Sequence, residues 1–400
     1  MFRAFRHRNY RLFFSGQLIS VCGTWMQTVA QSWLIYRMTG SAILLGIVGF
    51  VSQFPVFLLS PVGGAAADRH NRRLILIATQ ITAMLLAFVL AALTLTGAIR
   101  VWHIPVLAAM LGIVNAFDMP TRQAFMVELV GKDDLINAIA LNSSMFNSAR
   151  MIGPAIAGVL VAAIGEGWCF FVNAASYLAV IAGLLLMLPT GSNQVRAPGT
   201  VMDVMGEGFR YVWSNRPVRA LLLLLGVISL MSISYAVLMP IFANKILNGG
   251  ARAMGVLMSS AGAGALVGAL TLAARRGVKG LDRWIAICAV GLGVSLILFS
   301  MSHTFWLSVA LLLPAGFFMV GQMASSNTLI QSLVPDRLRG RVMAVYSMML
   351  VGMAPFGSLL AGAVAHRFGA PFMVAFGGTV SIVAAIVYAV RLRVRAGERP

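Results

Sequence analysis

Long apolar segments recur along the chain, and short polar stretches separate them. The runs from Ala78 to Ala98 and from Leu221 to Ala243 are two examples. A helix needs about 20 apolar residues to cross the roughly 30 Å hydrocarbon core of a bilayer. The strands of a transmembrane barrel would instead give segments of about ten residues with alternating polarity, a pattern that this sequence lacks. The chain is therefore predicted to consist of membrane-spanning helices.

Twelve spans are predicted, at residues 12–36, 43–66, 74–98, 102–127, 142–165, 169–189, 219–243, 252–274, 284–301, 305–330, 341–365 and 371–391. The longest polar stretch follows the sixth span and includes an amphipathic run from Val201 to Trp213. It divides the chain into a six-helix bundle at 1–189, a linker at 190–218 and a second six-helix bundle at 219–400. The expected fold class is an all-α membrane protein made of two such bundles.

Basic residues are distributed unevenly over the polar stretches. If both chain ends lie on one side, that side carries 23 lysines and arginines, and the opposite side carries 5, at positions 37, 100, 245, 252 and 367. Cytoplasmic segments of membrane proteins are enriched in these residues. We therefore expect both termini and the linker to be cytoplasmic, in a bacterial inner membrane. The polar and basic segment from Met1 to Arg11 does not fit a cleaved signal peptide.

The composition agrees with lipid as the main solvent, because 60% of the residues are hydrophobic and only 10% are charged. A net charge of +19 would indicate nucleic acid in a soluble protein, but here the basic residues alternate with apolar runs, so no nucleic-acid partner is expected. Cys22, Cys169 and Cys288 lie far apart inside apolar spans and form neither a disulfide framework nor a metal site. No nucleotide-binding loop or catalytic triad is recognisable. We expect neither an enzyme nor a cofactor.

The two halves of the sequence match at a spacing of 204 residues. Equivalent positions are Gly64 and Gly268, Gly112 and Gly316, Gly158 and Gly362, and Gly165 and Gly369. A duplicated six-helix unit predicts two bundles related by an axis along the membrane normal, with a substrate site between them near the bilayer midplane.

After the second span, the chain reads Gly64-Ala-Ala-Ala-Asp68-Arg69-His70-Asn71-Arg72-Arg73. A small residue at Gly64 allows two helices to approach closely, and Asn71 is expected to adopt the left-handed backbone conformation. The segment resembles the signature loop of the major facilitator superfamily, with Asn71 in place of the usual glycine. The resemblance implies a gating role for Asp68 with its basic neighbours, whereas an ordinary basic cytoplasmic loop is the alternative.

Further segments resemble the branch of this superfamily that includes the enterobactin exporter. They are residues 115–124, 128–130, 137–143 and 149–158. This branch also includes lysophospholipid flippases. Gly153, Pro154 and Gly158 resemble in part the glycine-proline motif of exporters, and generic close helix packing is the alternative. The resemblance implies a secondary transporter that exports a small organic molecule by proton antiport and needs no oligomer.

Three charged residues fall in or at the edge of spans, where a charge costs from about 2.5 kcal/mol upward. Asp118 and Arg122 are four residues apart and share a helix face, and Pro120 between them frees the carbonyl of Ala116. Arg150 lies at a similar depth. Asp118 either carries the coupling proton and pairs with one of these arginines when ionised, or forms a permanent structural ion pair. The family resemblance also implies that Arg122 works with Asp68 at a cytoplasmic gate.

Other polar residues inside spans are candidates for lining a substrate cavity: Gln27, Gln31, Asn115, Asn142, Asn147, Gln322, Asn327 and Gln331. With 24 methionines, 23 phenylalanines and 7 tryptophans in the chain, we expect a large apolar cavity with a few hydrogen-bonding groups. Such a cavity favours a siderophore or a drug-like cargo. The alternatives are a facilitator or lysophospholipid flippase of the same fold, and a non-transporting membrane receptor.

Overall fold

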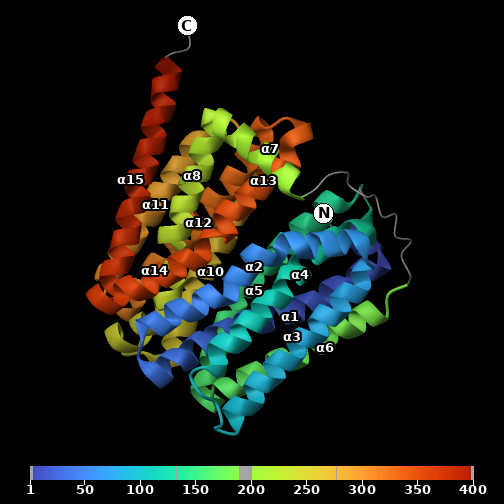
Figure 1. Cartoon of the computed structure of the whole chain (residues 1–400). Coiled ribbons are helices and arrows are strands. Elements are labelled where there is room, and N and C mark those ends of the chain that lie inside the picture. The colour runs from blue at the N-terminus through green and yellow to red at the C-terminus, as the bar shows by residue number, and fades with distance from the viewer. Residues whose placement is uncertain (1–2, 132, 189–200, 276, 398–400) are drawn as a thin grey trace. The chain divides into compact units, whose positions relative to one another are not determined.

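The computed structural model describes residues 3–131, 133–188, 201–275 and 277–397, with the side chains of 201–205 and 391–397 left out. Nearly all of these residues are helical, and none of them lies in a strand (Figure 1). After a short turn η1 (Arg3–Arg6), the first half contains α1 (Arg8–Thr39), α2 (Ala42–Arg69), α3 (Arg72–Leu95), α4 (His103–Val130), α5 (Leu135–Ile164) and α6 (Glu166–Leu185).

The second half begins with the amphipathic helix α7 (Val201–Ser214). It continues with α8 (Arg216–Met231), η2 (Ile233–Leu238), α9 (Met239–Ile241), η3 (Phe242–Ile246), α10 (Gly250–Ala274), α11 (Leu281–Met301), α12 (Phe305–Leu333), α13 (Asp336–Val351), α14 (Met353–Phe368) and α15 (Ala370–Gly397).

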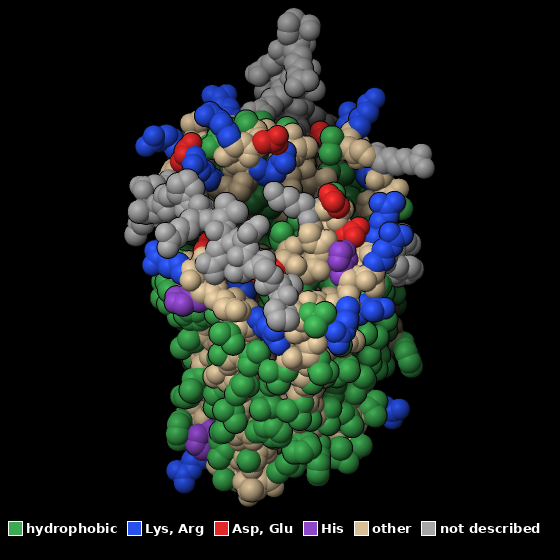
Figure 2. Space-filling model, turned by 90° about the vertical axis from the view of Figure 1, so that its right-hand side faces the viewer, with side chains coloured by type: hydrophobic (Ala, Val, Ile, Leu, Met, Phe, Trp, Pro, Cys, Tyr) green, Lys and Arg blue, Asp and Glu red, His purple; other side chains and the backbone are tan. Residues whose placement is uncertain are grey.

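Eleven helical stretches in the described part of the chain are long and apolar enough to cross a membrane. Helix α1 has 32 residues and is long enough to be the twelfth span, although Gln17, Gln27 and Gln31 make it more polar than the others. Figure 2 shows a broad surface of hydrophobic side chains, with Lys and Arg gathered beyond one edge of it. The predicted all-α membrane protein is confirmed.

Two predicted spans are not continuous helices. The seventh ends as an α-helix at Met231 and continues through the 3-10 turn η2 and the π-helical turn η3. Pro240 follows this break and lies in the first turn of α9, where its missing amide is tolerated. The eleventh span divides at Gly352 into α13 and α14, and Pro355 lies in the first turn of α14, where a proline is tolerated.

The chain folds into two compact units. The first contains Met1–Gly40, Val51–Pro198 and Gly250–Ser259, and the second contains Ser41–Phe50, Gly199–Gly249 and Ser260–Pro400. The first residues of α2 thus pack within the second unit and those of α10 within the first. The predicted linker at 190–218 is helical from Val201 to Ser214, and its residues up to 200 lie outside the described part. The predicted domain boundaries stay a prediction.

Equivalent positions of the two halves have equivalent surroundings. Gly165 and Gly369 have φ angles of 89° and 91°, and each ends one helix and precedes the next. A side chain at Gly158 would lie 2.9 Å from the Cα atom of Gly255, and one at Gly362 would lie 2.8 Å from that of Gly46. Helix neighbours also correspond, since α1 packs on α5 and α6 as α8 packs on α14 and α15. These shared contacts agree with a duplicated six-helix unit.

Candidate functional site

Asp118 lies buried inside the first unit, with 2% of its surface exposed. The Thr79 hydroxyl donates a hydrogen bond to Oδ1 at 3.0 Å, and the Gln80 amide donates to the same atom at 2.8 Å. The Arg122 guanidinium, one turn along α4, forms an ion pair with Oδ2. The carboxylate is therefore held by donors from two helices, α3 and α4.

Arg122 extends the same network to two more helices. Its Nη1 atom donates to the side-chain oxygen of Gln17 on α1 at 3.1 Å. Its guanidinium carbon lies 5.9 Å from the ring centre of Phe146 on α5, a distance that allows a cation–π contact. The buried network formed by Gln17, Thr79, Gln80, Asp118 and Arg122 is called the Asp118 network below. A change in the charge of Asp118 would therefore alter contacts among α1, α3, α4 and α5.

The local sequence places this network at an irregular point of α4. Pro120 lies one turn after Ala116 and cannot donate to its carbonyl. The carbonyl of Ala116 instead faces Gly63 of α2, so closely that any side chain at Gly63 would overlap it. Close helix approach was expected at Gly64, and that expectation was wrong, because a side chain at Gly64 would meet nothing within 4 Å. The close approach to α4 is made at Gly63 instead.

Arg150 takes a different place from Arg122. Its guanidinium carbon lies 5.6 Å from the ring centre of Trp25 on α1. Of the two arginines considered as partners of the acid, the structure brings Arg122 into the ion pair with Asp118.

Arg72 connects the signature loop to the end of α4. Its Nη1 atom lies 2.8 Å from Glu128 Oε1 and also donates to the carbonyl of Ala124, while its Nε atom donates to the carbonyl of Ala67 at 3.0 Å. Asp68 is 54% exposed, and its carboxylate is 3.4 Å from Arg72 Nη2. The implied pairing of Asp68 with Arg122 is thus not the one found, since Asp68 pairs with Arg72 and Arg122 pairs with Asp118.

The remaining loop residues have separate contacts. Arg73 donates to the carbonyl of Leu185 at the end of α6 at 3.0 Å, and Arg69 is exposed. Asn71 has φ −65° and ψ 111°, and its side-chain oxygen accepts from the amide of Leu74. The expected left-handed conformation of Asn71 was therefore wrong. Asparagine is favoured here as the N-cap of α3.

The small residues of α5 serve two different contacts. A side chain at Gly153 would lie 2.6 Å from Trp25 Cβ on α1. Gly158 faces Gly255, and a side chain at Gly255 would lie 2.5 Å from the carbonyl oxygen of Pro154. Both contacts are close helix crossings of the kind that small residues permit.

The predicted cavity residues fall into two groups. Gln27, Gln31 and Gln322 are buried; the Gln27 oxygen accepts from Asn173 at 2.6 Å, and Gln322 donates to Ser326 at 3.2 Å. The half-buried group comprises Asn115, Asn142, Asn147, Asn327 and Gln331. In that group, Gln331 donates to Asn327 at 2.6 Å and Asn147 donates to its own helix at 2.9 Å. Gln27 and Gln322 thus already form hydrogen bonds to side chains of their own unit.

Sequence reasoning missed two features. The first is the pair Thr79 and Gln80, although two adjacent polar residues in an apolar span are a usable signal. The second is Glu166, which is buried at the start of α6 and accepts two hydrogen bonds from Arg37 at the end of α1, at 2.7 and 3.1 Å. A single acid that directly follows a helix-ending glycine between two apolar spans would have indicated it. This ion pair fixes α1 against α6 at the end away from the signature loop.

Comparison with known proteins identifies the family. The family described as transmembrane secretion effector matches residues 1–399. The chain is 28% identical to the staphyloferrin A transporter of Staphylococcus aureus, an alignment that covers 90% of each chain. It is also 28% identical to the multidrug efflux pump Tap of Mycobacterium tuberculosis, over 88% of this chain and 86% of the pump.

Solved structures show the same fold. A variant of the nucleoside transporter NupG matches with a TM-score of 0.76 at 12% identity, over 96% of this chain and 99% of that chain. A bacterial homologue of the human lysosomal transporter Spinster matches with a TM-score of 0.73 at 14% identity, over 97% of each. With its apolar spans, its signature loop and these relatives, the chain is a multi-pass membrane protein that belongs to the transmembrane secretion effector family of the major facilitator superfamily.

Proposed function

We propose that this protein exports a small organic molecule, of the siderophore or drug-like class, from the cytoplasm across the inner membrane in exchange for protons. Two similar proteins carry the names staphyloferrin A transporter and multidrug efflux pump. The observation that carries the coupling proposal is Asp118, a buried acid in an apolar span whose ion-pair partner is on the next turn. Acids inside membrane spans commonly serve as proton relays.

The coupling step proceeds by an exchange of partners in the Asp118 network. Ionised Asp118 holds Arg122 by charge and accepts from Thr79 and Gln80. A proton on Asp118 removes that charge, so Arg122 is left with Gln17 and the face of Phe146. Protonation thus changes which contacts bind α4 to α1 and α3. A ligand, here the proton, shifts a conformational equilibrium only through such a difference between states.

Cargo recognition is assigned to the half-buried amides and the apolar residues around them. Asn115 and Asn142 of the first unit are only partly covered by the protein. A few hydrogen-bonding groups in an apolar cavity orient an amphipathic molecule, and methionine and aromatic side chains adapt to its shape. The relatives' names, a siderophore transporter and multidrug pumps, fit such cargo.

Two experiments test the proposal. Cells that lack the protein should accumulate the cargo, which a comparison of their small-molecule extracts with those of wild-type cells would identify. In everted membrane vesicles, uptake of that cargo should stop when an ionophore collapses the proton gradient. Gradient-independent uptake would instead indicate a facilitator or a lysophospholipid flippase.

Topology gives a separate prediction. Because of the 23 to 5 distribution of basic residues, reporters fused at Gly191 and at Arg395 should both be cytoplasmic. Alkaline phosphatase activity, which requires the periplasm, is expected to be low at both positions, and a fusion at Arg100 is expected to be active. High activity at Gly191 or Arg395 would contradict the orientation.

The signature loop is predicted to act as a gate. We expect Asp68→Asn to lower the initial rate of export about tenfold with near-normal expression, because its carboxylate makes a contact in one state that is absent in the other. Arg72→Gln should also lower expression, since it removes the bonds to Glu128 and to the carbonyls of Ala67 and Ala124.

The matched control for the gate is Asp336→Asn, which makes the same change at an exposed carboxylate that pairs with Arg339 outside the signature loop. Export rates are compared at equal amounts of protein, measured by immunoblotting. Wild-type export by a well-expressed Asp68→Asn protein would show that the loop has only a topological role.

A further inference from the structure

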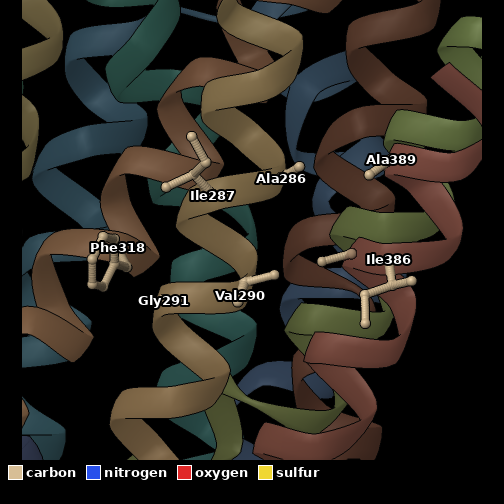
Figure 3. A pocket seen from close by; sticks show the side chains of 8 residues that line it. Ala286, Ile287, Val290, Gly291, Phe318, Ile386 and Ala389 are labelled. Carbon is tan, nitrogen blue, oxygen red and sulfur yellow. The ribbon is translucent and has the colours of Figure 1, made fainter. Parts of the chain in front are cut away.

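An apolar groove of about 380 Å³ opens on the surface of the second unit between α11, α12 and α15. Figure 3 shows Ile287 and Val290 on α11, Ile386 and Ala389 on α15, and Phe318 on α12 beside the groove. Ile287 is 55% exposed and Ile386 is 53% exposed. Since both helices are membrane spans, the groove faces the hydrocarbon of the bilayer.

Small residues between large ones create the groove. Gly291 has no side chain, and one built there would lie 2.6 Å from the ring of Phe318. On the facing helix, the lining residues Ala385 and Ala389 flank Ile386. The floor is therefore made of short side chains and the rims of branched or aromatic ones, a shape that accepts a long, narrow apolar chain.

The groove lies in one leaflet. Ile287 is six residues past the start of α11 at Leu281, which corresponds to about 9 Å, and Gly291 is about 15 Å past it. The hydrocarbon core is roughly 30 Å thick, so each leaflet occupies about half of that. The groove therefore runs through the acyl-chain region next to the basic loop that precedes α11.

A cation is positioned at the end of the groove. Arg283 is exposed and precedes Ile287 by four residues, so it lies on the same helix face, one turn closer to the start of α11. Helical side chains point toward the N-terminus, which brings its guanidinium to the headgroup level. Arg275 and Lys279 are also exposed in the preceding loop. Asp282 precedes the lining residue Ala286 by four residues and lies near Tyr388 of α15, so it is at the α15 side of this end of the groove, where the three basic residues outnumber it.

We propose that this groove is the binding site for one anionic phospholipid of the leaflet that adjoins the basic loops. Its phosphate pairs with Arg283, because a guanidinium matches phosphate geometry with two donors. One acyl chain lies along α11 over Gly291, between Phe318 of α12 and Ile386 of α15. The site lies in the second unit, outside the Asp118 network. Lipid binding there does not depend on whether Asp118 carries the coupling proton.

Native mass spectrometry of the purified full-length protein in detergent tests this site, with phosphatidylglycerol or phosphatidylcholine added as the probe. The wild-type protein should retain one tightly bound lipid and prefer phosphatidylglycerol. Arg283→Gln should bind phosphatidylglycerol about fivefold more weakly, which is the effect of one basic residue near the membrane surface. Ala389→Phe, which fills the groove, should weaken binding of both lipids.

Arg337→Gln is the matched control, because it removes an exposed arginine at the end of the molecule that carries the basic loops but on α13. It should bind both lipids as the wild type does. Wild-type binding of phosphatidylglycerol by both Arg283→Gln and Ala389→Phe would overturn the proposal. An equal loss of phosphatidylglycerol binding in Arg337→Gln and Arg283→Gln would also overturn it. Such a result would mean that the lipid responds to the overall surface charge and not to Arg283.

Discussion

The Asp118→Asn variant should still bind cargo and exchange it across the membrane, but should fail to concentrate it when a proton gradient is applied. Asparagine resembles the protonated acid in shape and carries no charge, and its side-chain oxygen can still accept from Thr79 and Gln80. The protein would remain in the loaded state and could not respond to the gradient. Cargo binding, expression and gradient-driven export are measured in parallel.

The structural interpretation of the same ion pair predicts a different failure. If Asp118 only pairs permanently with Arg122, the variant leaves a buried cation without its counter-ion, at a cost of about 3–5 kcal/mol. Expression and thermal stability would then fall together with binding. The two interpretations are therefore separated by whether the folded variant is obtained.

A double variant decides between them. Asp118→Asn combined with Arg122→Gln removes both charges of the observed ion pair. Recovery of driven export in this protein would eliminate the proton-carrier role, because no acid would remain there to titrate. Asp118→Asn combined with Arg150→Gln is the matched control, since Arg150 packs over Trp25.

Gly316→Ala is predicted to destabilise the second unit. A methyl group at Gly316 of α12 would overlap the backbone carbonyl of Ala261 on α10, and one at Gly264 of α10 would overlap that of Leu313 on α12. Backbone atoms of two packed helices cannot move aside as a flexible side chain can. Overpacking costs about 1–3 kcal/mol or more, so we expect a lower melting temperature and less monodisperse protein.

The control for this crossing is Gly64→Ala, where the added methyl group would meet nothing within 4 Å. Both variants replace a helical glycine by alanine, which by itself favours a helix. Thermal melting followed by fluorescence-detected size exclusion compares them directly. A Gly316→Ala protein that melts at the wild-type temperature would show that the two helices can separate at little cost.

Much of the fold could be predicted because lipid imposes simple rules on sequence. Every backbone group must be satisfied inside a span, so long apolar runs can only be helices. The 204-residue register predicted that Gly165 and Gly369 are equivalent, and both hold a left-handed φ between two helices. The helix breaks at Met231 and Gly352 could not be placed in the same way, because the sequence stays predominantly apolar across both of them.

The site was predictable only within one helix. Asp118 and Arg122 share a face by spacing alone, whereas Thr79 and Gln80 reach the acid from another helix, and the sequence does not give the rotation of α3 against α4. The same limit explains why Gly64 was chosen and Gly63 makes the contact. Asn71 illustrates a local limit, because asparagine suits both a left-handed turn and an N-cap.

The measurement that tests proton-coupled export most directly uses purified protein in liposomes with an acidic interior and with the identified cargo outside. The wild-type protein should accumulate cargo in the lumen above its outside concentration, and nigericin, which dissipates the gradient, should release it. Asp118→Asn liposomes should only equilibrate the cargo. Equilibration alone by the wild-type protein, at a rate that the gradient does not change, would contradict proton antiport.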